Sequence, residues 1–256
     1  PTHSTPPPPA LVPRHRPRYA GVTTWRFVVP APAGGVAPHE TWGAGMLWGS
    51  QPLHDGRVYA YASALAPAGG RAPDGERAEL LRRFGAWHRP VPDLLAAVEP
   101  GAVLRNDVYA VARPLPAYHR GRVALLGDAV HPMPPHLGQG GGQAIEDAVV
   151  LGLLARPAGD LAAALAEYTR VRLPRTTEVV RRSARVARLA TWRSAPARTL
   201  RAALLAGTAR LAPDLALRAL DGIADWNPPG GPGAAPGHVG SDAPGNSVGR
   251  SRGETQ

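Results

Sequence analysis

One segment near the middle of the chain constrains the fold more than any other. Residues 121–151 read GRVALLGDAVHPMPPHLGQGGGQAIEDAVVL. The apolar run from Arg122 to Leu126 predicts a buried strand that ends at Gly127, and an apolar helix is expected from about Ala144 to Ala155. A loop with several prolines and four glycines in five positions joins them. A strand, a glycine-rich loop and a helix in this order predict a binding site at the loop.

The polar and glycine residues of the loop indicate what such a site could hold. Ligands of open α/β sheets bind outside the carboxyl ends of the strands, which places Asp128 where a ligand's hydroxyl groups could be bound. The glycines at 138, 140, 141 and 142 leave the backbone bare, and the following helix start adds about half a positive charge. We therefore expect a flat or electron-rich group beside them.

Each of these residues, taken singly, also has a purely structural interpretation. Asp128 could cap the next turn, His131 could be a packed imidazole, and the glycines could form a plain flexible loop. Glu146 and Asp147 would suit the positive end of the helix dipole and need no further role. The pattern is therefore informative only as a whole.

The rest of the chain predicts a mixed α/β protein with α+β character. We expect an antiparallel sheet, because segments rich in β-branched and aromatic residues alternate with turn residues. The expected strands are Val22–Val29, Glu40–Trp48, Arg57–Ala64 and Val103–Ala112. The expected helices are Asp74–Trp87, Pro92–Val98, Asp160–Arg193 with an interruption at Pro174, and one or two helices within Ala195–Leu220.

These elements suggest five regions. Residues 1–17 are proline-rich and residues 227–256 carry hardly any apolar side chains, so both are expected to be disordered. Residues 18–118 would form the antiparallel sheet with its helices, and residues 119–195 would form the strand, loop and helices of the binding unit. Residues 196–226 would add C-terminal helices.

Cysteine is absent from the chain, which excludes disulfides, thiolate nucleophiles and cysteine-bound metal centres. Any redox chemistry would need a bound cofactor, and we expect no metal site. The chain has no apolar run of about 18 residues and no secretory signal at its start, so we expect a soluble, cytoplasmic protein that does not bind membranes.

The formal charge of +10 is carried entirely by arginine, because the chain contains no lysine. Such a bias is typical of a GC-rich genome and is weak support for a nucleic-acid partner. Residues 161–220 hold twelve arginines against three acids, which we interpret as a solvated basic helix face. No recognised nucleic-acid module accompanies it, so no nucleic-acid binding is expected.

Read as one string, the central segment resembles a known motif. The pattern GRVxLLGDAxHxxxPxxGQGxxxAIEDAxxL is similar to the second FAD-binding motif of the group A flavin-dependent monooxygenases, the family of p-hydroxybenzoate and salicylate hydroxylases. Tyr19–Arg26 resembles the YxGxxxWR start of that family's substrate-domain sheet, and Pro52–Tyr61 resembles a later strand. Tyr168–Ser183 resembles the family's YxxxRxPRxxxVVxxS helix. The resemblance therefore covers about residues 18–195.

The resemblance implies a substrate-domain antiparallel sheet joined to the last strand and helices of a Rossmann-like FAD-binding domain. It implies FAD as cofactor, with Asp128 on a ribityl or ribose hydroxyl and the backbone amides beyond it facing the flavin. The implied cofactor-binding residues are Gly127, Asp128, Pro135, Leu137, Gly138, Gln139 and Gly140.

The implied reaction is NADH- or NADPH-dependent hydroxylation by O2, through C4a-hydroperoxyflavin, of a small organic and aromatic substrate. The motif demands no acid or base, so no catalytic residue is assigned. Substrate contacts are expected from the loop near Pro134–Leu137 and from the cofactor-facing side of the sheet, where Arg26 could pair with a carboxylate or phenolate. The expected substrate residues are Trp25, Arg26, Met46, Trp48, Tyr59 and Tyr61, whose aromatic members could equally form a sheet core.

The family's first FAD-binding motif, GxGxxG at the start of a βαβ unit, does not occur in this sequence. The chain is expected to represent the C-terminal part of such an enzyme, truncated or completed by a separate N-terminal FAD-binding half. A noncatalytic remnant, or one half of a split flavoprotein, remains the alternative. The substrate and the choice between NADH and NADPH are left open.

Overall fold

The computed structural model describes residues 16–156, 159–211, 223 and 226–229. The chain divides into two compact units at residue 226, and the fold described below lies in the first unit. Its strands are β1 (Arg18–Pro30), β2 (His39–Trp42), β3 (Met46–Pro52), β4 (Arg57–Leu65), β5 (Leu104–Ala110), β6 (His119–Arg120) and β7 (Val123–Ala124). Its helices are α1 (Glu76–Phe84), α2 (Val91–Ala97), α3 (Gly140–Leu154), α4 (Leu161–Ala190) and α5 (Ala195–Leu211).

The first five strands form the antiparallel sheet that the sequence predicts. Their order is β2-β3-β4-β1-β5, and β1 pairs with β4 on one side and with β5 on the other. The expected strand Glu40–Trp48 is in fact a hairpin of β2 and β3. Gly45 adopts a φ of +72° in its turn, a conformation that glycine reaches without a steric penalty.

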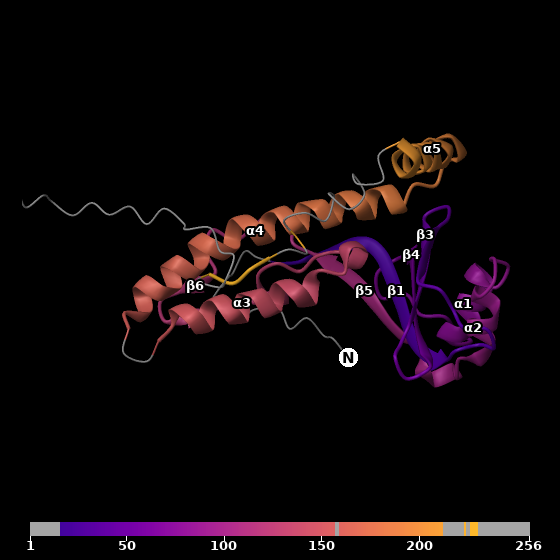
Figure 1. Ribbon diagram of the computed structural model, residues 1–256, viewed down its shortest axis with the longest axis horizontal. Coiled ribbons are helices and arrows are strands. Elements are labelled where there is room, and N and C mark those ends of the chain that lie inside the picture. The colour runs from indigo at the N-terminus through magenta and orange to yellow at the C-terminus, as the bar shows by residue number, and fades with distance from the viewer. Residues whose placement is uncertain (1–15, 157–158, 212–222, 224–225, 230–256) are drawn as a thin grey trace, which may run out of the picture. The chain divides into compact units, whose positions relative to one another are not determined.

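Helices α1 and α2 cover one face of this sheet (Figure 1). Trp25 and Trp48 point to that face and pack in one cluster with Leu80 and Phe84 of α1 and Leu94 of α2. The Trp48 side chain is fully buried, and its ring centroid lies 5.5 Å from that of Phe84. Because neighbouring side chains of a strand point to opposite faces, the residues next to these tryptophans face away from α1 and α2.

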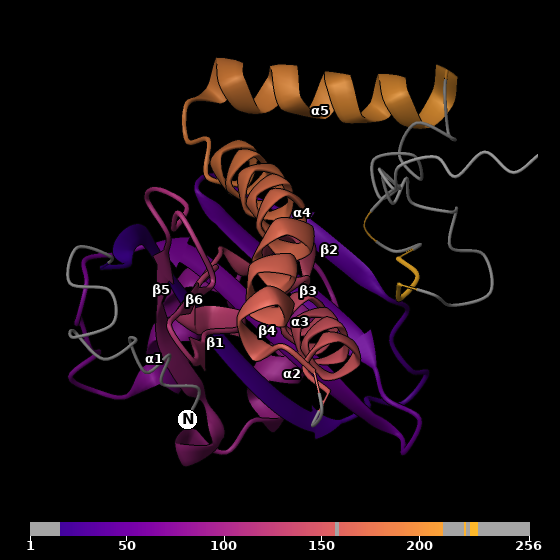
Figure 2. The same cartoon turned by 90° about the vertical axis from the view of Figure 1, so that its left-hand side faces the viewer.

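Helices α3 and α4 lie side by side and belong to a second hydrophobic cluster (Figures 1 and 2). Tyr118, Val150 and Tyr168 form its centre. The α4 helix begins where its sequence predicts, because the Asp160 carboxylate accepts hydrogen bonds from the backbone N–H groups of Ala162 and Ala163.

Two predictions in this part of the chain are wrong. The strand expected at Arg122–Leu126 is reduced to β7, which pairs only with β6, and Val123 and Leu126 are 44% and 39% exposed. No other strand lies beside β7 among the described residues, and of this apolar run Leu125 packs against the cluster that contains Tyr118 and Tyr168. The interruption expected at Pro174 is absent, and α4 continues through it. Pro174 is exposed, so water can satisfy the carbonyl group that its missing N–H leaves free.

The helix after the glycines also starts earlier than expected, at Gly140 instead of about Ala144. The termini expected to be disordered, and the helical residues expected beyond Leu211, lie largely outside the described residues. Within the described part of the chain, no helix has the length and apolar character needed to cross a bilayer.

Candidate functional site

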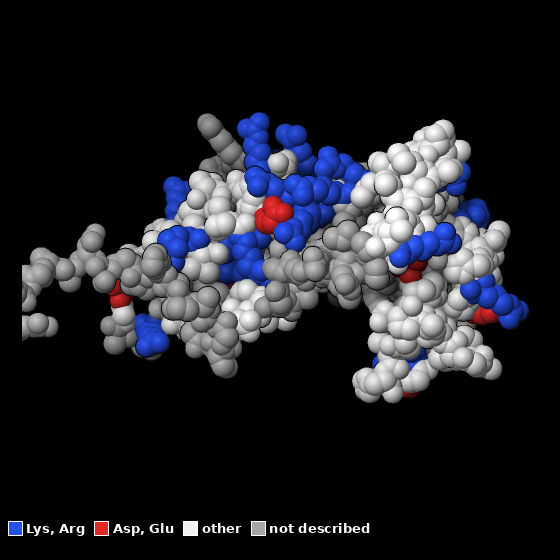
Figure 3. Space-filling view, turned by 45° about the horizontal axis from the view of Figure 1, so that its top comes forward, with Lys and Arg blue, Asp and Glu red and all other residues white. Residues whose placement is uncertain are grey.

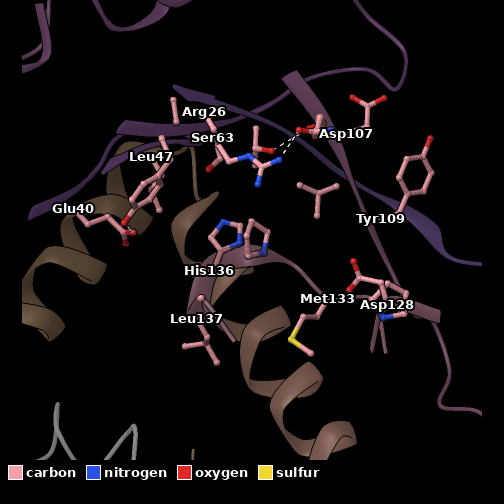
Figure 4. Close-up of a pocket in the computed structure, with 18 of the residues that line it drawn as sticks. Arg26, Glu40, Leu47, Ser63, Asp107, Tyr109, Asp128, Met133, His136 and Leu137 are labelled. Atoms are coloured by element: carbon pink, nitrogen blue, oxygen red, sulfur yellow. Dashed lines mark hydrogen bonds between the residues drawn. The ribbon is translucent and has the colours of Figure 1, made fainter. Parts of the chain in front are cut away.

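A cavity of about 580 Å³ lies between the five-stranded sheet and the loop of residues 128–138. The sheet supplies its wall from the face opposite α1 and α2, and the loop supplies the facing wall (Figure 4). The sheet residues that line it are Thr24, Arg26, Glu40, Leu47, Tyr59, Tyr61, Ala62, Ser63, Asn106, Asp107, Val108 and Tyr109. The loop residues that line it are Asp128, Pro132, Met133, Pro135, His136, Leu137 and Gly138.

The loop begins at a tight turn that hydrogen bonds from α3 hold in place. Gly127 has a φ of +59°, and its N–H donates to Asp147 Oδ2 of α3 at 2.9 Å. The same carboxylate oxygen lies 2.6 Å from Nε2 of His131, whose side chain is 1% exposed. Asp147 therefore fixes both ends of the short turn that presents Asp128 to the cavity.

Asp147 belongs to a buried ionic network between α3 and α4. Arg172 donates from Nε to Asp147 Oδ1 at 2.7 Å and from Nη1 to Glu146. Arg175 donates to both carboxylate oxygens of Glu146, at 2.6 and 2.7 Å. Burial alone would raise the pKa of Asp147, but the hydrogen bonds and charges of His131, Gly127 and Arg172 outweigh it and lower that pKa. Glu146 and Asp147 are thus buried ion-pair partners and not the helix-dipole acids that the sequence suggested.

More hydrogen bonds hold the loop on its far side. Ser183 of α4 donates to the Pro134 carbonyl, and the Val111 N–H donates to the Pro132 carbonyl at 2.9 Å. Tyr168 donates to the Leu125 carbonyl at 3.0 Å. The loop is therefore ordered from behind, and its cavity side stays open.

The glycine stretch is bare, as the sequence predicts. A Cβ atom placed on Gly138, Gly140 or Gly141 would meet no atom of the described structure within 4 Å. Gln139, at the N-cap of α3, makes no side-chain capping bond. The first N–H groups of a helix have no acceptor within the helix, so those of α3 are available to a ligand. The Gly138 N–H is not, because it donates to the Pro135 carbonyl.

His136 is a cavity residue within the loop from which substrate contacts are expected, although it was not singled out among the expected site residues. Both of its ring nitrogens are shielded from solvent and have no hydrogen-bond partner among the described residues. In Figure 4 its ring projects from the loop toward Arg26 of the sheet. Burial lowers the pKa of His136 to about 4, so the imidazole is neutral at physiological pH. A single histidine in a proline-rich loop has no periodic pattern that would reveal this position.

The sheet wall combines charged, polar and aromatic groups. Arg26 donates from Nη2 to Asn106 Oδ1 at 2.7 Å. Tyr61 donates to Glu40 Oε2 at 2.9 Å, and burial together with the Glu40 charge raises the pKa of Tyr61. The two cavity tyrosines, Tyr59 and Tyr61, have ring centroids 5.7 Å apart.

Three of the expected substrate residues, Arg26, Tyr59 and Tyr61, line the cavity, and three do not. Trp25 and Trp48 point to the opposite face of the sheet and are buried against α1 and α2, and Met46 packs against the same cluster. The expectation that these three face the cofactor side is corrected by the alternation of the strands: Trp25 and Arg26 are neighbours and cannot both face the cavity.

The expected cofactor-binding residues lie along one stretch of the loop. Asp128, Pro135, Leu137 and Gly138 line the cavity. Gly127 precedes Asp128, and Gln139 and Gly140 form the start of α3. Among the described residues, no group of three or more histidine, aspartate and glutamate side chains could hold a metal ion.

Comparison with known proteins identifies the family. The model of the family described as "FAD binding domain" matches residues 26–183. The chain belongs to this FAD-binding domain family. The resemblance to flavin-dependent monooxygenases drawn from the motifs is thereby confirmed.

Two curated relatives illustrate the similarity of this FAD-binding domain chain. It is 42% identical over 181 residues to aurachin C monooxygenase/isomerase of Stigmatella aurantiaca, a match covering 70% of this chain and 47% of the relative. It is 40% identical over 168 residues to the FAD-dependent urate hydroxylase of Klebsiella pneumoniae, covering 64% and 43% of the two chains. The chain thus spans about half the length of these relatives.

Solved structures agree with this assignment. The Klebsiella pneumoniae protein HpxO, in complex with FAD and uric acid, matches with a TM-score of 0.68 and 34% identity over 75% of this chain and 50% of that protein. A salicylate hydroxylase substrate complex matches with a TM-score of 0.58 over 81% of this chain and 58% of that one. Its identity of 24% supports the fold alone.

Proposed function

We propose that this FAD-binding domain chain supplies the substrate cavity and the flavin-facing loop of an FAD-dependent monooxygenase. The cavity between the sheet and the 128–138 loop carries the proposal, because it joins an exposed carboxylate, a bare glycine stretch and an uncapped helix start. Those are the groups that a ligand with hydroxyls and an electron-rich ring requires. The residues present therefore fit FAD.

Asp128 would hold a hydroxyl of the cofactor, since its carboxylate is exposed to the cavity and accepts hydrogen bonds. The free N–H groups at the start of α3 would face the negative charge that a reduced flavin carries. When bound, FAD would accept a hydride from NADH or NADPH and use O2 to oxygenate the substrate. The protein's part is to place both molecules and to exclude water.

The substrate that we propose is a small aromatic molecule. Leu47, Tyr59 and Tyr61 offer apolar and aromatic contact area, and Arg26 offers a cation for a carboxylate or phenolate. The Glu40 and Asp107 carboxylates on the same wall already accept hydrogen bonds from protein groups. Arg26 is the one arginine among the described lining residues, and its positive charge makes it the group most suited to orient an anionic substituent.

Flavin binding tests this proposal directly. The purified chain would be titrated with FAD, alone and after coexpression with the N-terminal half of the Klebsiella urate hydroxylase, and quenching of flavin fluorescence would be measured. We expect weak binding by the chain alone and tight binding in the complemented form, with NADH or NADPH oxidation when an aromatic substrate is supplied. A complemented form that binds FAD without turnover on any such substrate would favour the noncatalytic alternative.

Asp128→Ala provides the matched test of the site. Loss of the Asp128 carboxylate should weaken FAD binding by roughly tenfold or more, which is the effect of one charge-assisted hydrogen bond. Asp93→Ala serves as the control, because Asp93 lies on α2, pairs with Arg89 and is not among the described residues that line the cavity. Equal FAD affinity of the wild type and Asp128→Ala would contradict the proposed orientation of the cofactor.

A further inference from the structure

A second cavity, of about 480 Å³, lies between the sheet and the C-terminal half of α4. Val108 and His136 line both cavities, so the two adjoin. The second cavity is formed by small and apolar residues of β1 and β5, by the loop at Pro134 and His136, and by one face of α4. Its other lining residues are Ala20, Val22, Ala110, Arg181, Ala184, Arg185, Ala187, Arg188 and Thr191.

The charge of this cavity is one-sided. Arg181, Arg185 and Arg188 follow one another at spacings of four and three residues, which places them on the same face of α4. Among the described residues, no acidic side chain lines the cavity with them. Figure 3 shows basic side chains gathered along α4 on the face that it draws.

The three guanidinium groups have no close acceptor among the residues that the structure describes. Within the described part of the chain they make no hydrogen bond or ion pair, whereas Arg182 on the same helix pairs with Glu178 at 2.9 Å. The Glu178 carboxylate attracts Arg181 and Arg185 only at longer range. Three such cations around one hollow repel each other, and an anion between them would relieve that repulsion.

The remaining walls of the second cavity are mainly apolar and would contact the uncharged part of a ligand. Val22 and Val108 are 3% and 7% exposed and present apolar surface, and Ala184 and Ala187 leave room between the arginines. His136 adds two ring nitrogens that have no partner in the described structure. The cavity thus joins an apolar floor, a neutral polar group and a cationic rim.

We propose that this second cavity binds a small organic anion, with its apolar body against Val22 and Val108 and its carboxylate or phosphate group against Arg181, Arg185 and Arg188. This inference goes beyond the proposed monooxygenase function, because the site needs no flavin. His136 lines both cavities, so an occupant of the second would touch a residue of the first. The arginine-rich helix, interpreted from sequence as a plain solvated face, gains a specific role.

Isothermal titration calorimetry of the 256-residue chain without flavin tests the site. The probes are 2-naphthoate, inorganic phosphate and the neutral 2-naphthalenemethanol. We expect saturable binding of 2-naphthoate, weaker binding of phosphate and none of the alcohol. The variant Arg181→Gln/Arg185→Gln/Arg188→Gln should bind 2-naphthoate at least about tenfold more weakly, while Arg182→Gln, the control on the same helix, should bind as the wild type does.

A second variant separates a cavity from a charged surface. Ala184→Leu keeps every charge but fills the hollow, so it should weaken 2-naphthoate binding and leave phosphate binding nearly unchanged. Circular dichroism would confirm that each variant is folded, and Arg185→Gln alone would replace the triple variant if that one misfolds. The proposal is overturned if Arg182→Gln weakens binding as much as the triple variant, if Ala184→Leu has no effect, or if only Arg26→Gln abolishes binding.

Discussion

Replacing Arg172 by methionine should cost more stability than any comparable change on α4. The Arg172 side chain is fully buried, and it bonds to Asp147, Glu146 and Gln143. Methionine has similar length but offers no donor, so Asp147, which is itself fully buried, loses the cation that compensates its charge. Breaking a buried ion pair on one side typically costs about 3–5 kcal/mol.

That loss would be a large share of the free energy of unfolding of a typical domain, which is about 5–15 kcal/mol. Urea denaturation followed by circular dichroism would measure it as a shift of the midpoint with an unchanged slope. Arg170→Met is the matched control, because Arg170 lies two residues earlier on the same helix, is 73% exposed and pairs with Glu167. Exposed pairs contribute about 0–1 kcal/mol, so the control should stay close to the wild type.

The pH dependence gives an independent check. The lowered pKa of Asp147 means that its contribution to stability is present above the unfolded-state pKa and is lost as pH falls through the folded-state pKa. Without Arg172 the pKa of Asp147 rises, so acidification lowers the free energy of unfolding of the variant less than that of the wild type. The stability gap between them should narrow below about pH 4. An Arg172→Met protein within about 1 kcal/mol of the wild type at pH 7 would refute the importance of this network.

Two further predictions concern the loop. Burial lowers the pKa of His136 to about 4, so as pH falls the unfolded chain binds a proton at this histidine before the folded chain does. The free energy of unfolding of the wild type should therefore fall by up to about 3 kcal/mol between pH 6.5 and 4, and that of His136→Gln should not show this loss. Urea denaturation across that pH range measures the difference. Gly127→Ala should destabilise the protein by about 1–3 kcal/mol, because alanine is strained at a φ of +59° and its Cβ would lie 3.1 Å from that of Ala144. Gly121→Ala is the control, because Gly121 has a φ of +58° but open space around it, and this variant should lose less stability. Equal melting temperatures of the two variants would contradict the contribution of the contact with Ala144.

Local sequence signals predicted the elements whose determinants are themselves local. The start of α4 follows from Asp160, whose side chain accepts the first free N–H groups of the helix. The antiparallel sheet follows from its β-branched and aromatic segments. The bare glycines follow from the absence of side chains, and the structure leaves Gly138 and Gly140 uncovered.

Tertiary contacts decide the features that the sequence missed. Alternation along β1 places Trp25 and Arg26 on opposite faces, but only the packing of α1 and α2 determines which face is buried. The sequence indicated the Pro134–Leu137 loop as a source of contacts, but which of its side chains faces the sheet, as His136 does, depends on how the loop folds back. Likewise Glu146 and Asp147 look like acids of a first helical turn until α3 begins at Gly140 and Arg172 of α4 reaches them.

Hydrogen bonds from α3 and α4 order the loop before any ligand binds. Asp147 bonds to Gly127, just before the loop, and to His131 within it, and Ser183 bonds to the Pro134 carbonyl. If the loop became ordered only around its ligand, the conformational entropy it loses would weaken binding. This loop is already ordered when the chain folds, so ligand binding does not carry that cost. Rigid support behind and bare backbone in front are the conditions under which fixed amide dipoles act on a bound group without reorganising. Substitutions in the buried network should therefore lower ligand affinity even though none of its residues reaches the cavity.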